Sequence, residues 1–264
     1  MTSAGYPRAR TERAPGYPER FVVPTGCEPW EVPLPGYAPP YHVDARVLAM
    51  DRTRTPGGWA DPEDVTRVAL PPGVARDGAG RPLNPMGRTG LAGRGKLGRW
   101  GENRAADPVV LLLDGGALHA VLIERALPVV VGGQERYPWA IPGGMADDGE
   151  APHDTLAREL REETGLEVSF AGARVAWQGQ VDDPRTTDHA WLTTTAAYLL
   201  VDRERASALR AMDDARTVCA VPVTAELLDN MYANHAELMR AVLRDLSARD
   251  TVPAAVRQAA SDLT

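Results

Sequence analysis

Cysteine, lysine and long apolar runs are all scarce in this chain of 264 residues. The two cysteines, Cys27 and Cys219, have no CxxC spacing, which argues against a zinc ribbon and a disulfide framework. No apolar run reaches the roughly 20 residues that a membrane-spanning helix needs. The first residues also lack the hydrophobic core of a signal peptide. We therefore expect a cytoplasmic protein with reduced thiols and no membrane contact.

Positive charge is in deficit as well. The chain has 29 Lys and Arg against 36 Asp and Glu, a net charge of −7 and a pI near 5.3. This balance argues against a nucleic-acid partner, although a metal ion can still bridge an acidic protein to an anionic substrate. The length suits one large domain or a core domain with an extension. Monomer and dimer both stay open, with the monomer favoured.

The composition changes along the chain. Residues 1–45 are rich in Pro, Gly and Tyr, which predicts extended structure with many turns rather than helix. Residues 83–107 contain six glycines. We predict a smaller N-terminal region over residues 1–104 and a core domain over residues 105–264.

The segment GLAGRGKL, residues 90–97, has the glycine and lysine spacing of a phosphate-binding loop. It lacks the Ser or Thr that follows the lysine in such loops, and no clear strand precedes it, so we reject that interpretation. Two roles stay open for Arg88, Arg94 and Arg99: they line an anion site, or they belong to a structural connector.

The core domain alternates between strand-like and helix-like patterns. Gly115–Gly116 separates two short apolar runs, which predicts a hairpin. Pro152 suits the first turn of a helix and Gly165 suits its C-terminal cap. The expected elements are strands over 109–114, 118–124, 174–181 and 190–200 and helices over 152–164 and 235–248. Mixed strands with a few helices indicate an α/β sandwich.

The helix predicted over 152–164 is strongly acidic. Glu159 and Glu163 are four residues apart and share one helix face, with Glu162 beside them and Glu150 just ahead. Carboxylates gathered in this way repel one another, and a cation relieves the repulsion. Oxygen ligands favour Mg²⁺ or Mn²⁺, and Mg²⁺ commonly shares its ligands with substrate phosphates. The competing interpretation is a solvated helix face with a surface pair between Arg158 and Glu162.

The spacing of this segment decides between the two. Nine residues define this spacing: Gly144, Glu150, Arg158, Glu159, Leu160, Glu162, Glu163, Gly165 and Leu166. Each would match by chance at about one position in ten or fewer. The segment resembles the signature of the Nudix hydrolases at every one of these positions. The resemblance implies an α/β/α sandwich with a mixed sheet and a metal-dependent cleavage of nucleoside diphosphates linked to another group.

The resemblance also implies roles for individual residues. Glu159 and Glu163 would bind Mg²⁺ or Mn²⁺, Glu162 would assist, and a backbone carbonyl near Gly143 would complete the coordination. The same three glutamates are the expected catalytic residues. Structural support of the loop and helix is expected from Gly144, Glu150, Arg158 and Gly165.

A second stretch narrows the substrate class. VDDPRTTDHAW, residues 181–191, together with WAIPGGM at 139–145, resembles the ADP-ribose pyrophosphatase branch of the family. That branch includes the Nudix-like domain of a melastatin-type cation channel. It implies hydrolysis of ADP-ribose to AMP and ribose 5-phosphate, with substrate contacts from Asp183, Arg185, Tyr232 and His235. His189 departs from the Asn expected there. The competing interpretation of the stretch is a polar hairpin with Asp-Pro turn chemistry.

Two other functions remain open. In the first, the protein is an enzyme that cleaves another nucleoside-diphosphate derivative. In the second, it is a non-catalytic ADP-ribose sensor like the channel domain, in which the Nudix motif has decayed after its arginine. The intact glutamates of this chain favour an enzyme. The general base is open among Glu162, Asp182, Asp183 and Asp188.

Overall fold

The computed structural model describes residues 6–125, 129–131, 134–206, 208–212 and 215–264. The chain forms two compact units. Unit 1 comprises residues 1–103 and 180–193, and unit 2 comprises residues 104–179 and 194–264. The predicted division between residues 104 and 105 lies one residue from the first boundary of these units, but it did not include residues 180–193 in unit 1.

A twisted sheet forms the centre of unit 2. Its main path runs in the order β11-β4-β3-β10-β9, with β7 paired to β4 and β8 paired to β3. The strands are β3 (Gly101–Asp114), β4 (Ala117–Arg125), β7 (Trp139–Ala140), β8 (Gly144–Met145), β9 (Arg174–Gln180), β10 (Ala190–Leu200) and β11 (Ala215–Pro222). β3 and β10 begin in unit 1 and end in unit 2.

The predicted hairpin is confirmed. β3 and β4 are antiparallel, and Asp114 pairs with Ala117 across Gly115 and Gly116. Both glycines have positive φ, 57° and 83°, as a tight two-residue turn between twisted strands requires. The strands predicted over 174–181 and 190–200 correspond to β9 and β10.

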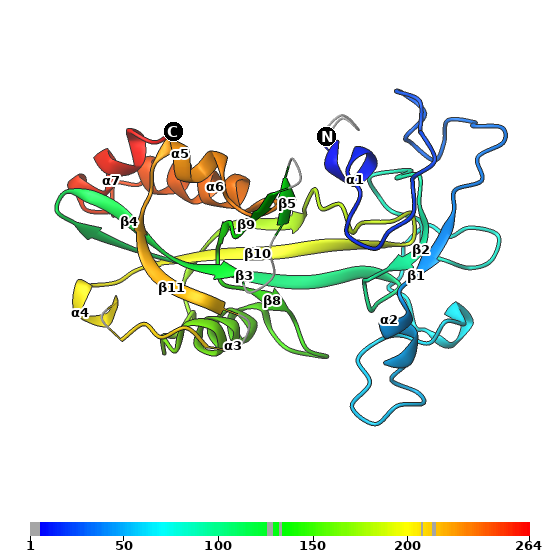
Figure 1. Cartoon of the computed structure of the whole chain (residues 1–264), viewed down its shortest axis with the longest axis horizontal. Coiled ribbons are helices and arrows are strands. Elements are labelled where there is room, and N and C mark those ends of the chain that lie inside the picture. The colour runs from blue at the N-terminus through cyan, green and yellow to red at the C-terminus, as the bar shows by residue number, and fades with distance from the viewer. Residues whose placement is uncertain (1–5, 126–128, 132–133, 207, 213–214) are drawn as a thin grey trace. The chain divides into compact units, whose positions relative to one another are not determined.

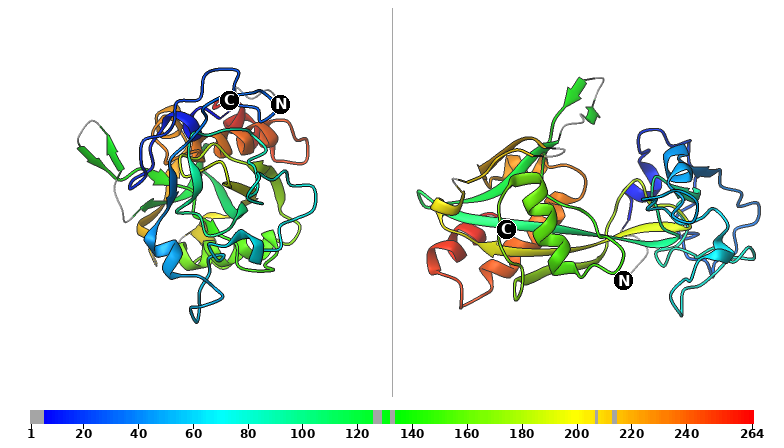
Figure 2. Two further views of the ribbon diagram at one scale, coloured as in Figure 1. Left: turned by 90° about the vertical axis from the view of Figure 1, so that its right-hand side faces the viewer. Right: turned by 90° about the horizontal axis from the view of Figure 1, so that it is seen from below.

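Helices cover the two faces of this sheet. α3 (Pro152–Thr164) packs on one side, and α5 (Ala225–Asp229), α6 (His235–Ser247) and α7 (Ala254–Ser261) lie on the other (Figures 1 and 2). The predicted α/β class and mixed sheet are confirmed. The remaining elements of unit 2 are β5 (Val129–Val131), β6 (Gln134–Arg136) and α4 (Arg203–Ala206). Within the described ranges, no helix is long and apolar enough to cross a membrane.

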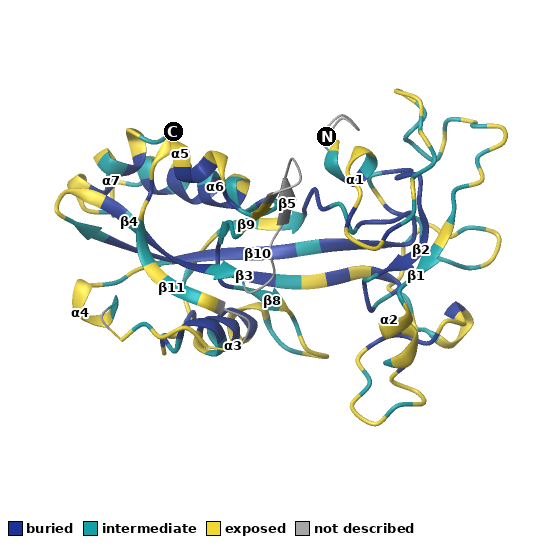
Figure 3. Ribbon diagram, in the orientation of Figure 1, coloured by how far each residue is buried: buried dark blue, intermediate teal, exposed yellow. Residues whose placement is uncertain are grey.

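Apolar side chains fix both helix layers on the sheet. Leu156 and Leu160 of α3 are 2% and 0% exposed and pack with Val110, Val121 and Phe170. Burial of each such side chain contributes about 1.5–3 kcal/mol. On the other face, α6 buries Leu238, Met239, Val242, Leu243 and Leu246. Figure 3 shows the buried central strands and the exposed outer helix surfaces. The leucines of α3 therefore set the rotation that aims its carboxylates.

Unit 1 contains little regular structure. Its elements are α1 (Arg8–Thr11), β1 (Tyr41–Val43), α2 (Ala45–Ala49), the 3₁₀ turn η2 (Val65–Arg67) and β2 (Ala92–Gly95), which is parallel to β1. The prediction that residues 1–45 contain no helix is wrong at α1. The N–H groups of Arg8 and Ala9 donate to the carboxylate of Asp182, at 3.0 and 2.8 Å. This cap comes from a residue far along the chain, so local sequence does not reveal it.

Buried arginines hold the glycine-rich segment together. Arg94 is 0% exposed and donates to the carbonyls of Asp61 and Gly98, both at 2.7 Å. Arg88 donates to the carbonyls of Cys27 and Pro29. Of the two roles left open for these arginines, the contacts of this pair fit the structural connector.

Candidate active site

α3 is the element that positions the acidic side chains. Pro152 occupies the first turn of the helix, and Gly165 caps its C-terminal end. The φ of Gly165 is 69°, in the left-handed region, and its N–H donates to the Arg161 carbonyl. Glu159 and Glu163 are each 9% exposed. They lie one turn apart on a flank of the helix, next to the buried stripe of leucines.

A glycine pair meets these two carboxylates. β8 lies beside β3 with Gly144 opposite Ala106. The Gly143 N–H donates to Glu163 Oε2 at 2.8 Å. A Cβ placed on Gly144 would lie 2.7 Å from the Glu159 carboxylate. Both glutamates therefore converge on the Gly143–Gly144 backbone. A side chain at Gly143 would meet backbone atoms, whereas one at Gly144 would displace the Glu159 carboxylate.

Arg158 binds three of the four signature glutamates. Its guanidinium donates twice to Glu150 at 2.9 Å, once to Glu159 at 2.8 Å and once to Glu162 at 3.0 Å. It also donates to the Met145 carbonyl. The hydrogen bonds with Glu150 are the main cause that raises the pKa of Arg158 above its ordinary value. The mutual repulsion expected from the sequence is thus relieved by an arginine within the same motif.

The glutamates differ in how firmly they are ionised. Hydrogen bonds from Arg158 lower the pKa of Glu150 from 4.5 to about 2. Burial raises the pKa of Glu159, although the nearby charge of Arg158 opposes the shift. Glu150 is therefore a fixed anion of the scaffold. Burial disfavours the charged form of Glu159, so an added cation would stabilise this carboxylate.

Glu150 is expected to make stability depend on acidity. Its pKa is lower in the folded state, so its contribution is complete above pH 4.5 and is lost as pH falls towards 2. Glu150→Gln should therefore lower the free energy of unfolding by roughly 2 kcal/mol at pH 7. The difference from wild type should shrink below pH 4.5. Urea unfolding at several pH values measures this, and a pH-independent difference would contradict it.

The ligand types near Gly143 fit a hard divalent cation. Glu159, Glu162, Glu163 and the Gly143 carbonyl supply only oxygen atoms, which suits Mg²⁺ or Mn²⁺ better than Zn²⁺. Among the residues that the structure describes, no three His, Cys, Asp or Glu side chains are gathered around one point. Glu159 and Glu162 are turned towards Arg158 instead. A cation bound here would take over part of the role of that guanidinium.

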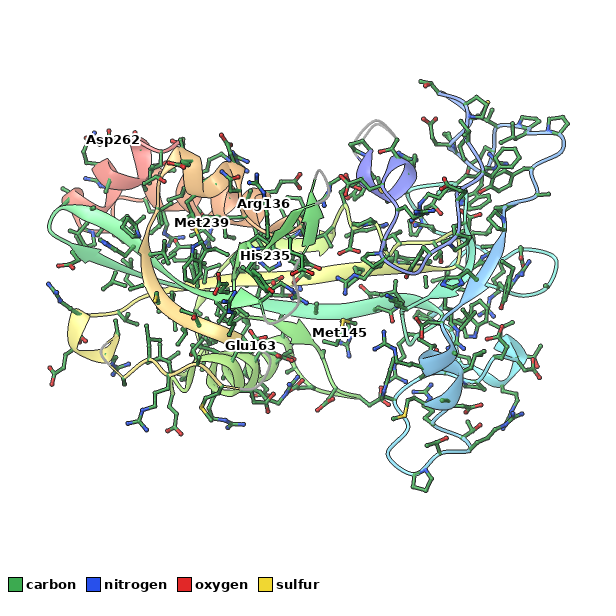
Figure 4. The ribbon with its side chains drawn as sticks, viewed as in Figure 1. Arg136, Met145, Glu163, His235, Met239 and Asp262 are labelled. Atoms are coloured by element: carbon green, nitrogen blue, oxygen red, sulfur yellow. The ribbon has the colours of Figure 1, made fainter. Side chains whose placement is uncertain are left out.

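Tyr232 and His235 lie together in unit 2. Their rings meet edge to face with centroids 5.6 Å apart, and the Arg125 guanidinium lies 4.3 Å from the centre of the Tyr232 ring. The Tyr232 N–H donates to the Trp139 carbonyl. Figure 4 shows His235 on the α6 side of the sheet and Glu163 on the α3 side. This arrangement offers an aromatic face beside a cation.

Asp183 and Arg185 lie together in unit 1. Arg185 donates to both oxygens of Asp183, at 2.9 and 2.8 Å. Burial acts to raise the pKa of Asp183, but the charge and hydrogen bonds of Arg185 outweigh it and hold the pKa below its usual value. The structure thus gathers the four predicted substrate residues as two pairs in different units. Their substrate roles remain predictions.

The neighbouring acids of the 181–189 loop serve unit 1 itself. Asp182 caps α1, and Asp188 accepts hydrogen bonds from the Tyr37 hydroxyl at 2.7 Å and the Thr89 N–H at 2.7 Å. Tyr17 and Arg20 donate to backbone carbonyls of the same loop. The loop therefore anchors the N-terminal segment, a function that the polar-hairpin interpretation did not include. It also makes Asp182 and Asp188 poor candidates for the general base.

His189 is a structural residue of the same loop. Its Nδ1 lies 3.0 Å from the Pro82 carbonyl, and burial lowers its pKa. The His that departs from the expected Asn is thus engaged with a carbonyl within unit 1.

Sequence reasoning missed three residues around the site. Asp107 is 9% exposed within the buried stretch of β3, where it accepts a hydrogen bond from Thr194 on β10. Arg125 ends β4 over the Tyr232 ring. Only Asp107 had a signal in the sequence: it precedes an apolar run in AADPVV, and a carboxylate buried there needs a partner. Nothing in the sequence pointed to Thr194 or Arg125.

The fold and site define a class of protein: an α/β/α sandwich whose acidic helix follows a glycine loop, as in pyrophosphate hydrolases. Residues 102–242 match the family model of the NUDIX domain, and residues 23–101 match that of the NUDT9-like N-terminal domain. The chain therefore belongs to the Nudix hydrolase family.

Relatives with related names match most of the chain. The putative nudix hydrolase 6 of Caenorhabditis elegans is 35% identical over 83% of this chain and 88% of its own length. The mitochondrial ADP-ribose pyrophosphatase of Rattus norvegicus is 35% identical over 89% of this chain and 77% of its own. A transient receptor potential cation channel subfamily M member-like 2 of Nematostella vectensis is 33% identical over 90% of this chain and 17% of its own.

Proposed function

We propose that the protein hydrolyses the pyrophosphate of ADP-ribose to AMP and ribose 5-phosphate with Mg²⁺ or Mn²⁺. The observation that carries this proposal is the convergence of Glu159 and Glu163 on the Gly143–Gly144 backbone. The 35% identity with a mitochondrial ADP-ribose pyrophosphatase supports the choice of substrate. Localisation in the cytoplasm remains part of the proposal.

The residues of the site divide the work of phosphorus chemistry. A divalent cation bound by Glu159 and Glu163 would offset the charge of the pyrophosphate and favour ionisation of water. Arg158 orients Glu159 and Glu162, since one nitrogen of its guanidinium donates hydrogen bonds to both. Glu162 is the most exposed of the three, with 39% of its side chain accessible, so it is our candidate for taking the proton from the attacking water. Positioning and charge stabilisation then supply most of the rate.

The aromatic face of Tyr232 suits a nucleobase. The Arg125 guanidinium lies over one face of the ring, and His235 meets the ring edge to face. Adenine would stack on the face opposite Arg125. The carboxylate of Asp183 would accept hydrogen bonds from ribose hydroxyls, and the guanidinium of Arg185 would bind phosphate through two N–H groups. Both assignments come from the family resemblance and are part of this proposal.

Tyr232→Ala is expected to raise the KM for ADP-ribose by about tenfold, since stacking of a base on an aromatic ring is worth about 1–3 kcal/mol. Tyr232→Phe should keep most of the affinity because the ring face remains. Steady-state kinetics on both variants measures the effect. Tyr198→Phe, which removes a hydroxyl bound to Asp245 elsewhere in unit 2, is the control. Equal KM values for Tyr232→Ala and wild type would remove Tyr232 from the substrate site.

The test of the function is ADP-ribose turnover with each metal, followed by chromatography of AMP. A panel with NADH, a nucleotide sugar and a dinucleoside polyphosphate ranks substrates by kcat/KM. A higher kcat/KM for one of these would keep the enzyme class and replace the substrate.

The second candidate is a non-catalytic ADP-ribose sensor, which the cation-channel relative favours. The intact Glu159, Glu162 and Glu163 argue for turnover instead. Calorimetric binding of ADP-ribose without release of AMP would establish the sensor and reject the diphosphatase.

A further inference from the structure

Asp107 occupies an unusual place beside the glycine pair. It lies in β3, next to Ala106, which is opposite Gly144 of β8. A Cβ on Gly143 would lie 2.9 Å from Asp107 Oδ1 and 2.5 Å from the Ala106 carbonyl oxygen. The carboxylate of Asp107 therefore touches the backbone turn whose N–H binds Glu163.

Side chains from two further elements lie against this carboxylate. The hydroxyl of Thr194, on β10, donates to Asp107 Oδ2 at 2.5 Å. His235 Nε2, at the start of α6, lies 4.0 Å from Asp107 Oδ1. A buried carboxylate is costly without such partners, so its place here needs a reason beyond packing.

The ring of His235 links Asp107 to the same turn. Its Nδ1 accepts the N–H of Ile141 at 2.8 Å. Because a backbone N–H can only donate, the neutral ring carries its proton on Nε2, the atom that faces Asp107. The Ile141 N–H thus selects the tautomer, and the charge of Asp107, 4.0 Å from Nε2, favours this orientation of the ring. Ile141 lies two residues before Gly143.

We propose that Thr194, Asp107 and His235 form a positioning chain that fixes residues 141–143 for cation binding at Glu159 and Glu163. The chain joins β10, β3 and α6 to the turn, and none of its members needs to touch the cation. His235 then acts through Ile141 whether or not it also contacts substrate. This inference rests on the proposed metal-dependent function, and it deepens that function by assigning Asp107 and Thr194.

The test measures Mn²⁺ affinity directly by electron paramagnetic resonance of the free ion, without substrate. Thr194→Val keeps the carboxylate of Asp107 and removes only its anchor, so it separates positioning from simple loss of charge. We expect Mn²⁺ binding to weaken about 10-fold in Thr194→Val and 10- to 100-fold in Asp107→Asn, as for other partners of metal ligands. Thr194→Ser should restore it, since the hydroxyl remains.

Asp245→Asn is the matched control. Asp245 also accepts a hydrogen bond from a hydroxyl on β10, that of Tyr198 at 2.7 Å. It lies on α6, ten residues after His235, and is not among the atoms nearest to Gly143 or Gly144. Its Mn²⁺ affinity should equal that of wild type. Thermal unfolding of each variant identifies any that fail to fold. If Asp107→Asn fails to fold, the comparison of Thr194→Val with Thr194→Ser still tests the positioning chain.

Two results would overturn the positioning chain: unchanged Mn²⁺ affinity in folded Asp107→Asn, or equal affinities of Thr194→Val and Thr194→Ser. These outcomes are separate from the fate of the proposed function. If wild type binds Mn²⁺ but releases no AMP from ADP-ribose, the substrate assignment fails while the positioning chain is still tested by the same titration.

Discussion

Glu163→Gln is expected to lower kcat for ADP-ribose by about 10³-fold, the loss typical of removing a key charge from a preorganised site. The amide is nearly the same size as the carboxylate and still offers an oxygen to the Gly143 N–H, which Glu163 binds at 2.8 Å. The turn should therefore persist while the cation loses a charged ligand. Single-turnover assays with saturating Mg²⁺ measure the chemical step.

The control for this substitution is Glu167→Gln. Glu167 follows the same helix, undergoes the same chemical change and is exposed. Its kcat should match wild type, and both variants should unfold at the wild-type temperature. Activity of Glu163→Gln within a few-fold of wild type would show that this carboxylate is not a metal ligand in the reaction.

Gly143→Ala and Gly144→Ala are expected to fail for different reasons. At Gly143 the new methyl would meet the backbone oxygen of Ala106 at 2.5 Å, and neither strand can give way cheaply. Gly143→Ala should therefore lower the free energy of unfolding by about 2–4 kcal/mol, the range for overpacked and strained positions. At Gly144 the three atoms nearest to the methyl would all belong to the carboxylate end of Glu159, at 2.7 Å, and a flexible side chain can rotate away.

Gly144→Ala should thus fold almost as well as wild type but lose activity, by about 10²-fold, because a displaced ligand misplaces the reacting groups. Urea unfolding and ADP-ribose kinetics on both variants separate the two effects. Gly172→Ala supplies a surface control, since nothing lies within 4 Å of its added Cβ, although its φ of 77° adds some backbone strain of its own. An unstable Gly144→Ala with normal specific activity would reverse the assignment.

The sequence was most informative where local rules govern the chain. Pro152 and Gly165 predicted the limits of α3 to the residue, because a helix start tolerates a missing N–H and its end favours a left-handed glycine. Gly115 and Gly116 likewise predicted the β3–β4 turn. The signature spacing placed Glu159, Glu162 and Glu163 on one helix, and the hydrogen bonds of Arg158 with Glu150 agree with the structural support expected from these two residues.

Long-range partners were beyond local reasoning. Nothing near Arg8 announces that its N–H is capped by Asp182, and nothing near Asp107 announces Thr194 or His235. Asp182, Asp183 and Asp188 of the 181–189 loop were all candidates for the general base, because the sequence alone does not distinguish one aspartate from another. The structure separates them by their partners: Asp188 is bound by Tyr37 and Thr89, whereas Asp183 is paired with Arg185.

The interleaving of the two units has a consequence for how the chain folds during synthesis. Residues 180–193 complete unit 1, yet the ribosome makes them only after residues 104–179, which belong to unit 2. Until Asp182 emerges, α1 has no cap, and until Asp188 emerges, Tyr37 and Thr89 lack their acceptor. We therefore expect that the first 103 residues do not fold on their own, and that a fragment ending before the loop is unusually sensitive to proteases. Coexpression with a peptide of residues 180–193 provides a complementation assay for this dependence.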